Sequence, residues 1–234
     1  MKTASHKEAI AQEQPQASKK EQPSERTENI VALAIFVVLI LIGVGIFTQG
    51  FGLFNKDLNP GQRVKVPIGD DPYIGNSNAS VIIYVFSDYE CPNCKIGEER
   101  MKAILEKYGD KILYFFKNHP LTSIHPDAYN ASLAAECANE QGKFWEYHDY
   151  LFAHNTQLGA PYLEQYAKEI DLLDTERFNI CFETQRYKEK VDADLKSGAE
   201  IGVPGTPTFI INGLVVVGAK SEDEYIKIID AELK

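Results

Sequence analysis

The stretch DYECPNCKIGEER, residues 88–100, places two cysteines three positions apart, with a proline directly after the first. It follows VIIYVFS (81–87), a continuous apolar and β-branched run that predicts a buried central strand. The segment KIGEERMKAILEKYG (95–109) then has a helical period and ends in a glycine cap. Cys91 therefore stands where a strand ends and a helix begins. Pro92 suits the first helical position because its missing N–H is not needed there.

This position predicts different chemistry for the two sulfurs. A helix N-terminus offers free N–H groups and a positive dipole end, and both favour a thiolate at Cys91. Cys94 lies one turn deeper on the same helical face and gains less from either. One attacking sulfur and one resolving sulfur are what disulfide exchange requires.

Two other uses of the pair are weaker alternatives. A zinc site needs two more ligands at a workable spacing, but there is no second C-x-x-C, and Cys137 and Cys181 stand alone in helical segments. A purely structural disulfide between Cys91 and Cys94 would close too small a loop to stabilise the chain much. We therefore expect a redox-active pair and no metal.

The surrounding pattern predicts an α/β domain with one helical interruption. KILYFFKN (111–118) is a second buried strand, and a strand, a helix and a strand form a βαβ unit with parallel strands. From 126 to 198 helical periods recur without a strand-like run. Strands return in TPTFIING and LVVVG, which join at the tight-hairpin pair Asn212-Gly213.

Three smaller elements complete the domain. The last segment, SEDEYIKIIDAELK, predicts an amphipathic helix with Ser221 as N-cap and Glu224 in the capping-box position. We expect RVKVP (63–67) to form a short edge strand and GDDPYIGNSNAS (69–80) to form turns.

The N-terminal region predicts a membrane anchor. Residues 1–29 are rich in Gln, Glu, Ser and Lys and contain no aromatic residue, which is typical of a disordered tail. The apolar run Ile30–Phe47 would span about 27 Å as a helix, close to the ~30 Å hydrocarbon core of a bilayer. We predict a transmembrane anchor over 30–48 and a linker over 49–63. A buried core helix would show a polar face, and a cleaved signal peptide would have a shorter leader and an A-x-A site.

The distribution of charge along the chain indicates which partners the domain can bind and bears on its orientation in a membrane. The tail has five basic and five acidic residues, so the whole net charge of −10 lies beyond the predicted span, with all four cysteines. An acidic domain is a poor partner for nucleic acid. The positive-inside count around the span is a tie, so the orientation must follow from the chemistry of the domain.

Three blocks, in this order, resemble a known family. FSDYECPNC, HPLTSIHPDAYNASLAAECANEQGKFWEYHDYLF and GTPTFIING together resemble the DsbA-like branch of the thioredoxin superfamily, which are thiol-disulfide oxidoreductases of the cell envelope. The resemblance covers residues 64–234. It implies a thioredoxin fold with an inserted helical domain at about 125–199.

The resemblance also implies roles for single residues. Cys91 and Cys94 would be the catalytic pair, supported by Pro92 and Asn93 between them. Pro207 would be a cis-proline that faces the pair, and Thr206 would offer backbone hydrogen bonds to a bound substrate peptide.

One position departs from many thioredoxin-type proteins. Those proteins have a buried acid six residues before the first cysteine, whereas this chain has Val85. Asp88 and Glu90 are closer to the motif, and we interpret them as solvated charges of the turn. How Cys94 loses its proton stays open at this point.

The other two cysteines are candidates for a structural disulfide. Cys137 and Cys181 each fall in a helix of the insert, and an even cysteine count outside the cytosol favours pairing. The alternative is two buried free thiols that act as small apolar residues.

These expectations combine into one functional hypothesis. The chain would be anchored by Ile30–Phe47 with its domain outside the cytoplasm, where it donates its disulfide to reduced exported polypeptides. A quinone-linked membrane enzyme would reoxidise it, and no bound cofactor is needed. The alternatives are a reductase or isomerase of the same fold, or a redox-inert anchored chaperone.

Overall fold

The computed structural model describes residues 60–67, 69–171 and 173–234. The predicted tail, the predicted span Ile30–Phe47 and most of the predicted linker lie outside these residues. Within the described part, no helix is both long and apolar enough to cross a membrane.

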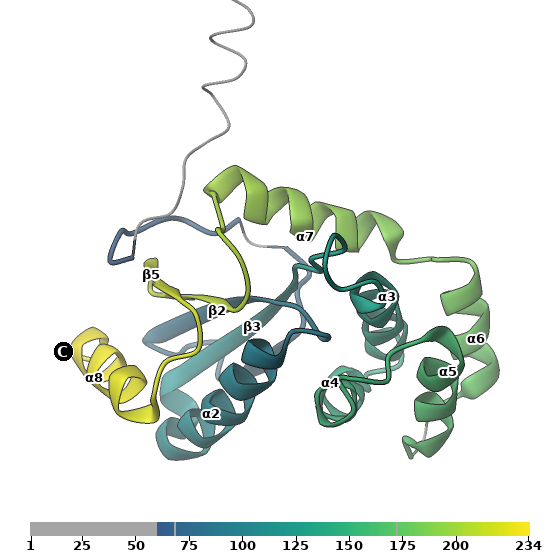
Figure 1. Cartoon of the computed structure of the whole chain (residues 1–234). Coiled ribbons are helices and arrows are strands. Elements are labelled where there is room, and N and C mark those ends of the chain that lie inside the picture. The colour runs from purple at the N-terminus through teal and green to yellow at the C-terminus, as the bar shows by residue number, and fades with distance from the viewer. Residues whose placement is uncertain (1–59, 68, 172) are drawn as a thin grey trace, which may run out of the picture. The chain divides into compact units, whose positions relative to one another are not determined.

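A five-stranded sheet in the order β1-β3-β2-β4-β5 forms the centre of the domain (Figure 1). The central strands β2 and β3 are parallel, with Tyr84 opposite Phe115, and the other neighbouring pairs are antiparallel. This confirms the βαβ unit and the hairpin at Asn212-Gly213, where both residues have positive φ. The strands are β1 (Tyr73–Gly75), β2 (Val81–Ser87), β3 (Ile112–Asn118), β4 (Thr208–Ile211) and β5 (Leu214–Val217).

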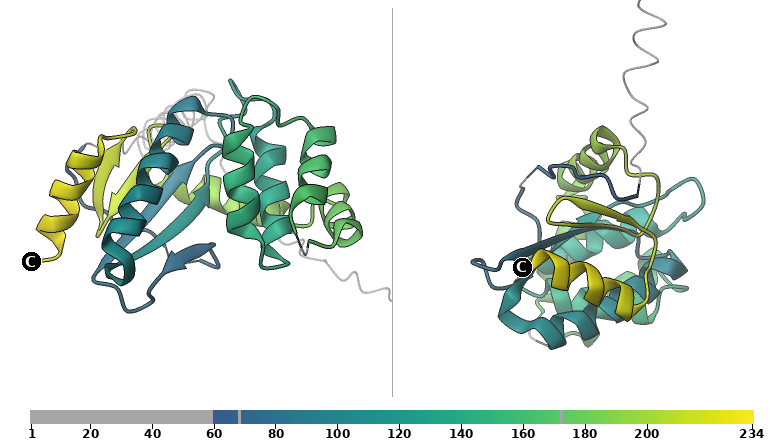
Figure 2. Two further views of the ribbon diagram at one scale, coloured as in Figure 1. Left: turned by 90° about the horizontal axis from the view of Figure 1, so that it is seen from below. Right: turned by 90° about the vertical axis from the view of Figure 1, so that its left-hand side faces the viewer.

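Helices cover both faces of this sheet. Helix α2 (Pro92–Tyr108) packs beside α8 (Glu222–Glu232) on one face, and part of α7 (Lys188–Ile201) lies over the other (Figure 2). As predicted, α2 ends at Gly109, where a single 3-10 turn (Gly109–Lys111) follows. A capping box between Ser221 and Glu224 opens α8, also as predicted.

The helical insert follows β3. Its first four helices lie together beside the sheet, and α7 runs from them back over it (Figure 1). These four helices are α3 (Ala128–Asn139), α4 (Phe144–Ala153), α5 (Ala160–Glu169) and α6 (Thr175–Glu183). Cys137 of α3 and Cys181 of α6 form a disulfide with a Cα–Cα distance of 5.8 Å, so the paired alternative holds and the free-thiol alternative does not. Such a bond contributes roughly 2–4 kcal/mol of stability.

The first strand differs from the expectation. RVKVP forms only a single bridge, Arg63 with Leu214, and the edge strand is Tyr73–Gly75 inside the segment expected to be turns. β1 has only three residues, all of them exposed, which is too short a run to show the apolar alternation that indicates a strand. The Gly61 N–H donates to the Val215 carbonyl, and the Val215 N–H donates to the Gln62 carbonyl, so contacts with the β4–β5 hairpin begin before residue 64.

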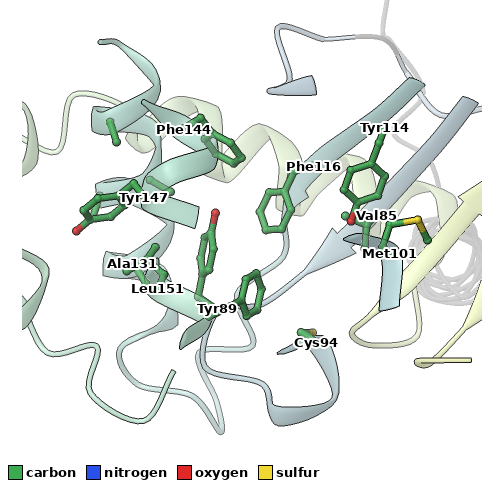
Figure 3. Close-up of a cluster of buried hydrophobic side chains, with 14 of the residues drawn as sticks. Val85, Tyr89, Cys94, Met101, Tyr114, Phe116, Ala131, Phe144, Tyr147 and Leu151 are labelled. Atoms are coloured by element: carbon green, nitrogen blue, oxygen red, sulfur yellow. The ribbon is translucent and has the colours of Figure 1, made fainter. Parts of the chain in front are cut away.

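One continuous core joins the sheet to the insert. Tyr89, just after β2, is fully buried beside Phe116 of β3, with ring centroids 5.2 Å apart (Figure 3). Its ring also packs on Phe152 of α4, with centroids 4.9 Å apart. Phe144 of α4 is buried in the same cluster. The turn that carries the cysteine pair is therefore attached to both parts of the domain.

Candidate active site

The cysteine pair lies at the junction of β2 and α2. Cys91 is the N-cap of α2, with an extended backbone, and Pro92 follows at the first helical position. The Cys91 side chain is 6 % exposed, whereas Cys94 is fully buried on the inner face of the helix. Pro92 and Asn93 are exposed at the first turn. Both sulfurs are free, so the structure represents the dithiol form.

Hydrogen bonds favour a thiolate at Cys91. The Cys94 thiol donates to it, and the backbone N–H groups of Cys94 and Asn93 at the helix N-terminus add further bonds. Together these contacts outweigh the burial of the group and lower the pKa of Cys91 to about 6. A thiol with this pKa is mostly ionised at neutral pH.

Cys94 has the opposite surroundings. Burial raises the pKa of Cys94 far above its ordinary value, and the neighbouring Cys91 charge raises it further. Ser87, the last residue of β2, is fully buried, and its hydroxyl acts to lower the pKa of Cys94, against the larger effect of burial. The sequence reasoning missed Ser87, although its place directly before the turn points to the site.

The loop before β4 completes the site. The Thr206–Pro207 peptide bond is cis, as the resemblance implies. In its protonated form the Cys91 thiol donates to the Thr206 carbonyl at 3.7 Å. The Pro207 ring lies against α2 at Gly97. The fold thus brings Cys91, Cys94, Thr206 and Pro207 together from segments more than a hundred residues apart, whereas Cys137 and Cys181 lie in the insert.

The acidic residues of the turn differ from the expectation. Asp88 is fully buried, not solvated, and it accepts hydrogen bonds from the Glu90 and Leu121 backbone N–H groups. The imidazole of His125 lies 2.8 Å from the same carboxylate. The interpretation as solvated charges is wrong because the loop after β3 folds onto the turn and needs acceptors for its backbone.

Val85 is fully buried in β2 and brings no carboxylate to the site. A buried carboxylate lies instead on α2. Glu98, one turn after Cys94 on α2, is 8 % exposed and accepts a hydrogen bond of 2.8 Å from the Tyr114 hydroxyl. Its other oxygen has no hydrogen-bond partner among the described residues. Glu98 and His148 line a cavity of about 280 Å³ between α2 and α4. The i, i+4 spacing from Cys94 was the sequence signal for Glu98.

Other histidines and acids are also candidates for site residues. His119, directly after β3, is buried against Phe86. Among the described residues, no group of three His, Cys, Asp or Glu side chains could hold a metal ion.

Comparison with known families and curated proteins gives two results. The profile of a family described as thioredoxin matches residues 68–231. The Na⁺/H⁺ antiporter NhaA 3 of Salinispora tropica is 38 % identical over 139 residues, which are 59 % of this chain and 21 % of that protein. An NhaA 1 antiporter of Mycobacterium sp. strain KMS is 30 % identical over 203 residues, 82 % of this chain and 32 % of that protein. The chain therefore spans only about a fifth to a third of these relatives.

Solved structures share the fold across most of their length. The oxidised form of BdbD from Bacillus subtilis has a TM-score of 0.68 and 22 % identity, over 75 % of this chain and 99 % of that one. The thiol-disulfide exchange protein alpha-DsbA2 from Wolbachia pipientis has a TM-score of 0.62 and 26 % identity, over 70 % and 87 %. DsbA2 of Pseudomonas aeruginosa has a TM-score of 0.60 and 23 % identity, over 71 % and 96 %.

Proposed function

The chain belongs to the thioredoxin family and is a DsbA-like thiol-disulfide oxidoreductase, and we propose that it works as an oxidase that donates the Cys91–Cys94 disulfide to reduced polypeptides. The observation that carries this proposal is the contrast between the two sulfurs. The pKa of Cys91 is lowered to about 6, while that of Cys94 is raised. A stabilised Cys91 thiolate favours the dithiol form over the disulfide, by about 30 mV for each 1.4 kcal/mol, and makes the disulfide more oxidising.

The reaction has two exchanges. A substrate thiolate attacks Cys91 Sγ in the disulfide, and the Cys91–Cys94 bond breaks with both its electrons on Cys94, which takes up a proton. A second substrate thiolate then attacks the substrate sulfur of the mixed disulfide, and Cys91 leaves as a thiolate. Its low pKa makes Cys91 a good leaving group, so the second exchange favours the oxidised substrate.

The substrate chain would lie along the loop before β4. Thr206 and Pro207 are next to Cys91, and the Thr206 carbonyl is already directed to its sulfur. A peptide in extended conformation would pair with the Thr206 backbone and present its cysteine to Cys91. Neither step needs a bound cofactor.

The place of action is part of the proposal. The predicted span Ile30–Phe47 would anchor the chain, with the domain outside the cytoplasm and a quinone-linked membrane enzyme as reoxidant. The Cys137–Cys181 disulfide supports an oxidising compartment, since such bonds are rare in reducing ones.

The test uses the oxidised full-length chain and a reduced, unfolded secreted protein with two thiols. We expect net disulfide formation in the substrate and a potential, measured against glutathione, well above the value of about −270 mV found for a reducing thioredoxin. A Cys94→Ser variant should accumulate a mixed disulfide, and a Cys91→Ser variant should not. A potential near the thioredoxin value without net oxidation would indicate a reductase. A Cys94→Ser variant that captures no substrate would indicate a redox-inert binding protein.

A further inference from the structure

Helix α2 contains a single glycine, Gly97, on its buried face. Gly97 follows Cys94 by three residues and precedes Met101 by four, so the three share one side of the helix, and all three are buried. Glycine is a poor helix former in this position, because it has the most backbone freedom to lose. Nothing within the helix itself favours a glycine here, so the reason must lie in what packs against it.

Two residues at the start of β4 lie against Gly97. A Cβ at this position would be 3.3 Å from Cγ of Pro207, and 3.2 and 3.3 Å from Cζ and Cε2 of Phe209. These distances are shorter than the optimal separation of about 3.5–4.0 Å between carbon atoms. Even a methyl group at position 97 would therefore push one of the two rings away from α2.

The Phe209 ring is the more firmly held of the two. It is fully buried, its residue pairs with Val85 of β2, and it packs edge-on against Tyr225 of α8 with ring centroids 5.2 Å apart. Pro207, in contrast, ends the loop between α7 and β4, in which residues 202–206 are all partly or fully exposed. A side chain at position 97 would thus displace the loop rather than the strand.

The part of this loop that can shift is the part next to Cys91. The Pro207 carbonyl accepts from the Gly218 N–H at 2.8 Å, which fixes the C-terminal side of the proline to the chain after β5. On the other side, the Thr206 carbonyl shares one planar peptide group with the Pro207 nitrogen, and its oxygen lies 3.7 Å from Cys91 Sγ. A shift of the proline ring therefore moves Thr206 relative to Cys91.

We propose that Gly97 is a positioning residue for the polypeptide substrate: its missing side chain leaves the space for the Pro207 ring, and the seated ring holds Thr206 beside Cys91. This inference rests on the proposed function, in which the substrate chain pairs with the Thr206 backbone and presents its cysteine to Cys91. If Thr206 is displaced, the substrate sulfur is held out of line with the Cys91–Cys94 bond. A small thiol has no chain to pair with Thr206, so its reaction does not depend on Gly97.

The first experiment compares two reductants of the oxidised full-length chain, namely a reduced, unfolded secreted protein with two thiols and dithiothreitol. In Gly97→Ala we expect kcat/KM for the polypeptide to fall about tenfold, mainly through a higher KM, because a small misplacement of reacting atoms is costly. The rate with dithiothreitol should stay within about twofold of that of the unmodified chain. The matched control is Glu106→Ala on the exposed face of the same helix, which should change neither rate.

The second experiment tests whether the effect is steric. Phe209→Leu removes the Cζ and Cε2 atoms that a methyl group at position 97 would meet, so the methyl group gains room without moving Pro207. In the Phe209→Leu background we expect Gly97→Ala to lower kcat/KM for the polypeptide by less than about threefold. The double variant also relieves the packing conflict if Gly97→Ala alone folds poorly.

The outcomes separate this inference from the proposed function. The inference is overturned if Gly97→Ala leaves the polypeptide rate unchanged, if both reductants slow equally, or if the loss is the same in the Phe209→Leu background. If the unmodified chain gives no net oxidation, the oxidase proposal fails. The same comparison is then made in the opposite direction, with a disulfide-containing polypeptide and cystamine, because both directions pass through the same mixed disulfide. A loss confined to the polypeptide would uphold the inference there too.

Discussion

Cys91 ionises near neutral pH, and Cys94, one helical turn away, does not. The difference comes from geometry that acts within a few ångströms. Cys91 accepts bonds from the helix N-terminus and from Cys94 itself, whereas Cys94 is enclosed by the core. The Cys94 thiol thus donates a hydrogen bond that stabilises the negative charge on Cys91.

This dependence gives a prediction for the reduced protein. Alkylation of Cys91 should follow a single ionisation with a midpoint at about pH 6, while Cys94 stays unreactive over the same range. In Cys94→Ala the midpoint should move upward, because the first contributor to the low pKa of Cys91 is removed.

The matched control is Cys94→Ser, which keeps a donor in place and should keep a lower midpoint than Cys94→Ala. If Cys94 is alkylated before Cys91, or if Cys91 titrates near the free-thiol value of about 8.5, the assignment of the two sulfurs is wrong.

Helix α7 is placed on the sheet by a close contact at one glycine. A Cβ at Gly198 would lie 2.6 Å from Nδ1 and 2.7 Å from Cε1 of His119, which is itself packed edge-on against Phe86. Glycine in a helix interior costs roughly 0.5–1 kcal/mol relative to alanine. The close approach of α7 to the end of β3 therefore outweighs helix propensity at this position.

We expect Gly198→Ala to destabilise the domain, although alanine is the better helix former. Overpacking of a filled core costs typically about 1–3 kcal/mol, more than the gain in propensity. Urea unfolding would measure the change. Ser197→Ala on the same helix is the matched control, because it removes a buried hydroxyl that has no hydrogen-bond partner among the described residues and should be neutral or stabilising. A Gly198→Ala variant as stable as the unmodified chain would show that the His119 ring moves aside freely.

A buried ionic cluster joins three parts of the domain. Lys117 of β3 lies 2.7 Å from Asp71, in the segment before β1, and 3.3 Å from Asp194 of α7. Lys190 of α7 pairs with the same two carboxylates at 2.9 and 2.6 Å. Glu136 of α3 lies beside the cluster and accepts from Asn118 at 2.7 Å. Loss of any one member would leave a buried charge without its partner.

The raised pKa of Glu136 should make the stability of the domain depend on pH. Burial raises the pKa of Glu136 to about 7, against the attraction of Lys190. Between its unfolded value of about 4.5 and about 7 the folded chain holds a proton that the unfolded chain has released, so stability falls as pH rises. Glu136→Gln should flatten this slope and gain up to roughly 3 kcal/mol at alkaline pH.

Urea unfolding between about pH 5 and 8 would measure both slopes. Glu140→Gln is the matched control, because the pKa of Glu140 is shifted in the opposite direction to that of Glu136. Partial burial would raise the pKa of Glu140, but ion pairs with Arg186 and Arg177 outweigh it and lower the pKa. In the unmodified chain the ionised Glu140 stabilises the fold at every pH above its unfolded pKa, and this contribution is lost only in acid. Glu140→Gln should therefore be less stable than the unmodified chain at neutral pH. An unchanged slope in Glu136→Gln would mean that Glu136 is ionised throughout the range.

The local signals of the sequence were enough for most elements and for the catalytic pair. The buried strands, the proline at the start of α2, the Asn212-Gly213 turn and the capping box of α8 each depend on a few adjacent residues. The resemblance added the cis-proline, which faces the pair from far along the chain. Elements with apolar periods or fixed turn chemistry can be found in this way because their signal is short-range.

Tertiary structure decided what depends on neighbours distant in sequence. An aspartate on a turn looks solvated until the loop of residues 119–127 covers it, and only that packing makes Asp88 a buried acceptor for His125. The three exposed residues of β1 become a strand because β3 offers them an edge. The sequence by itself determined which residues can carry charge or exchange disulfides. The fold determined their ionisation, because burial and hydrogen-bond partners set the free energy of a charge.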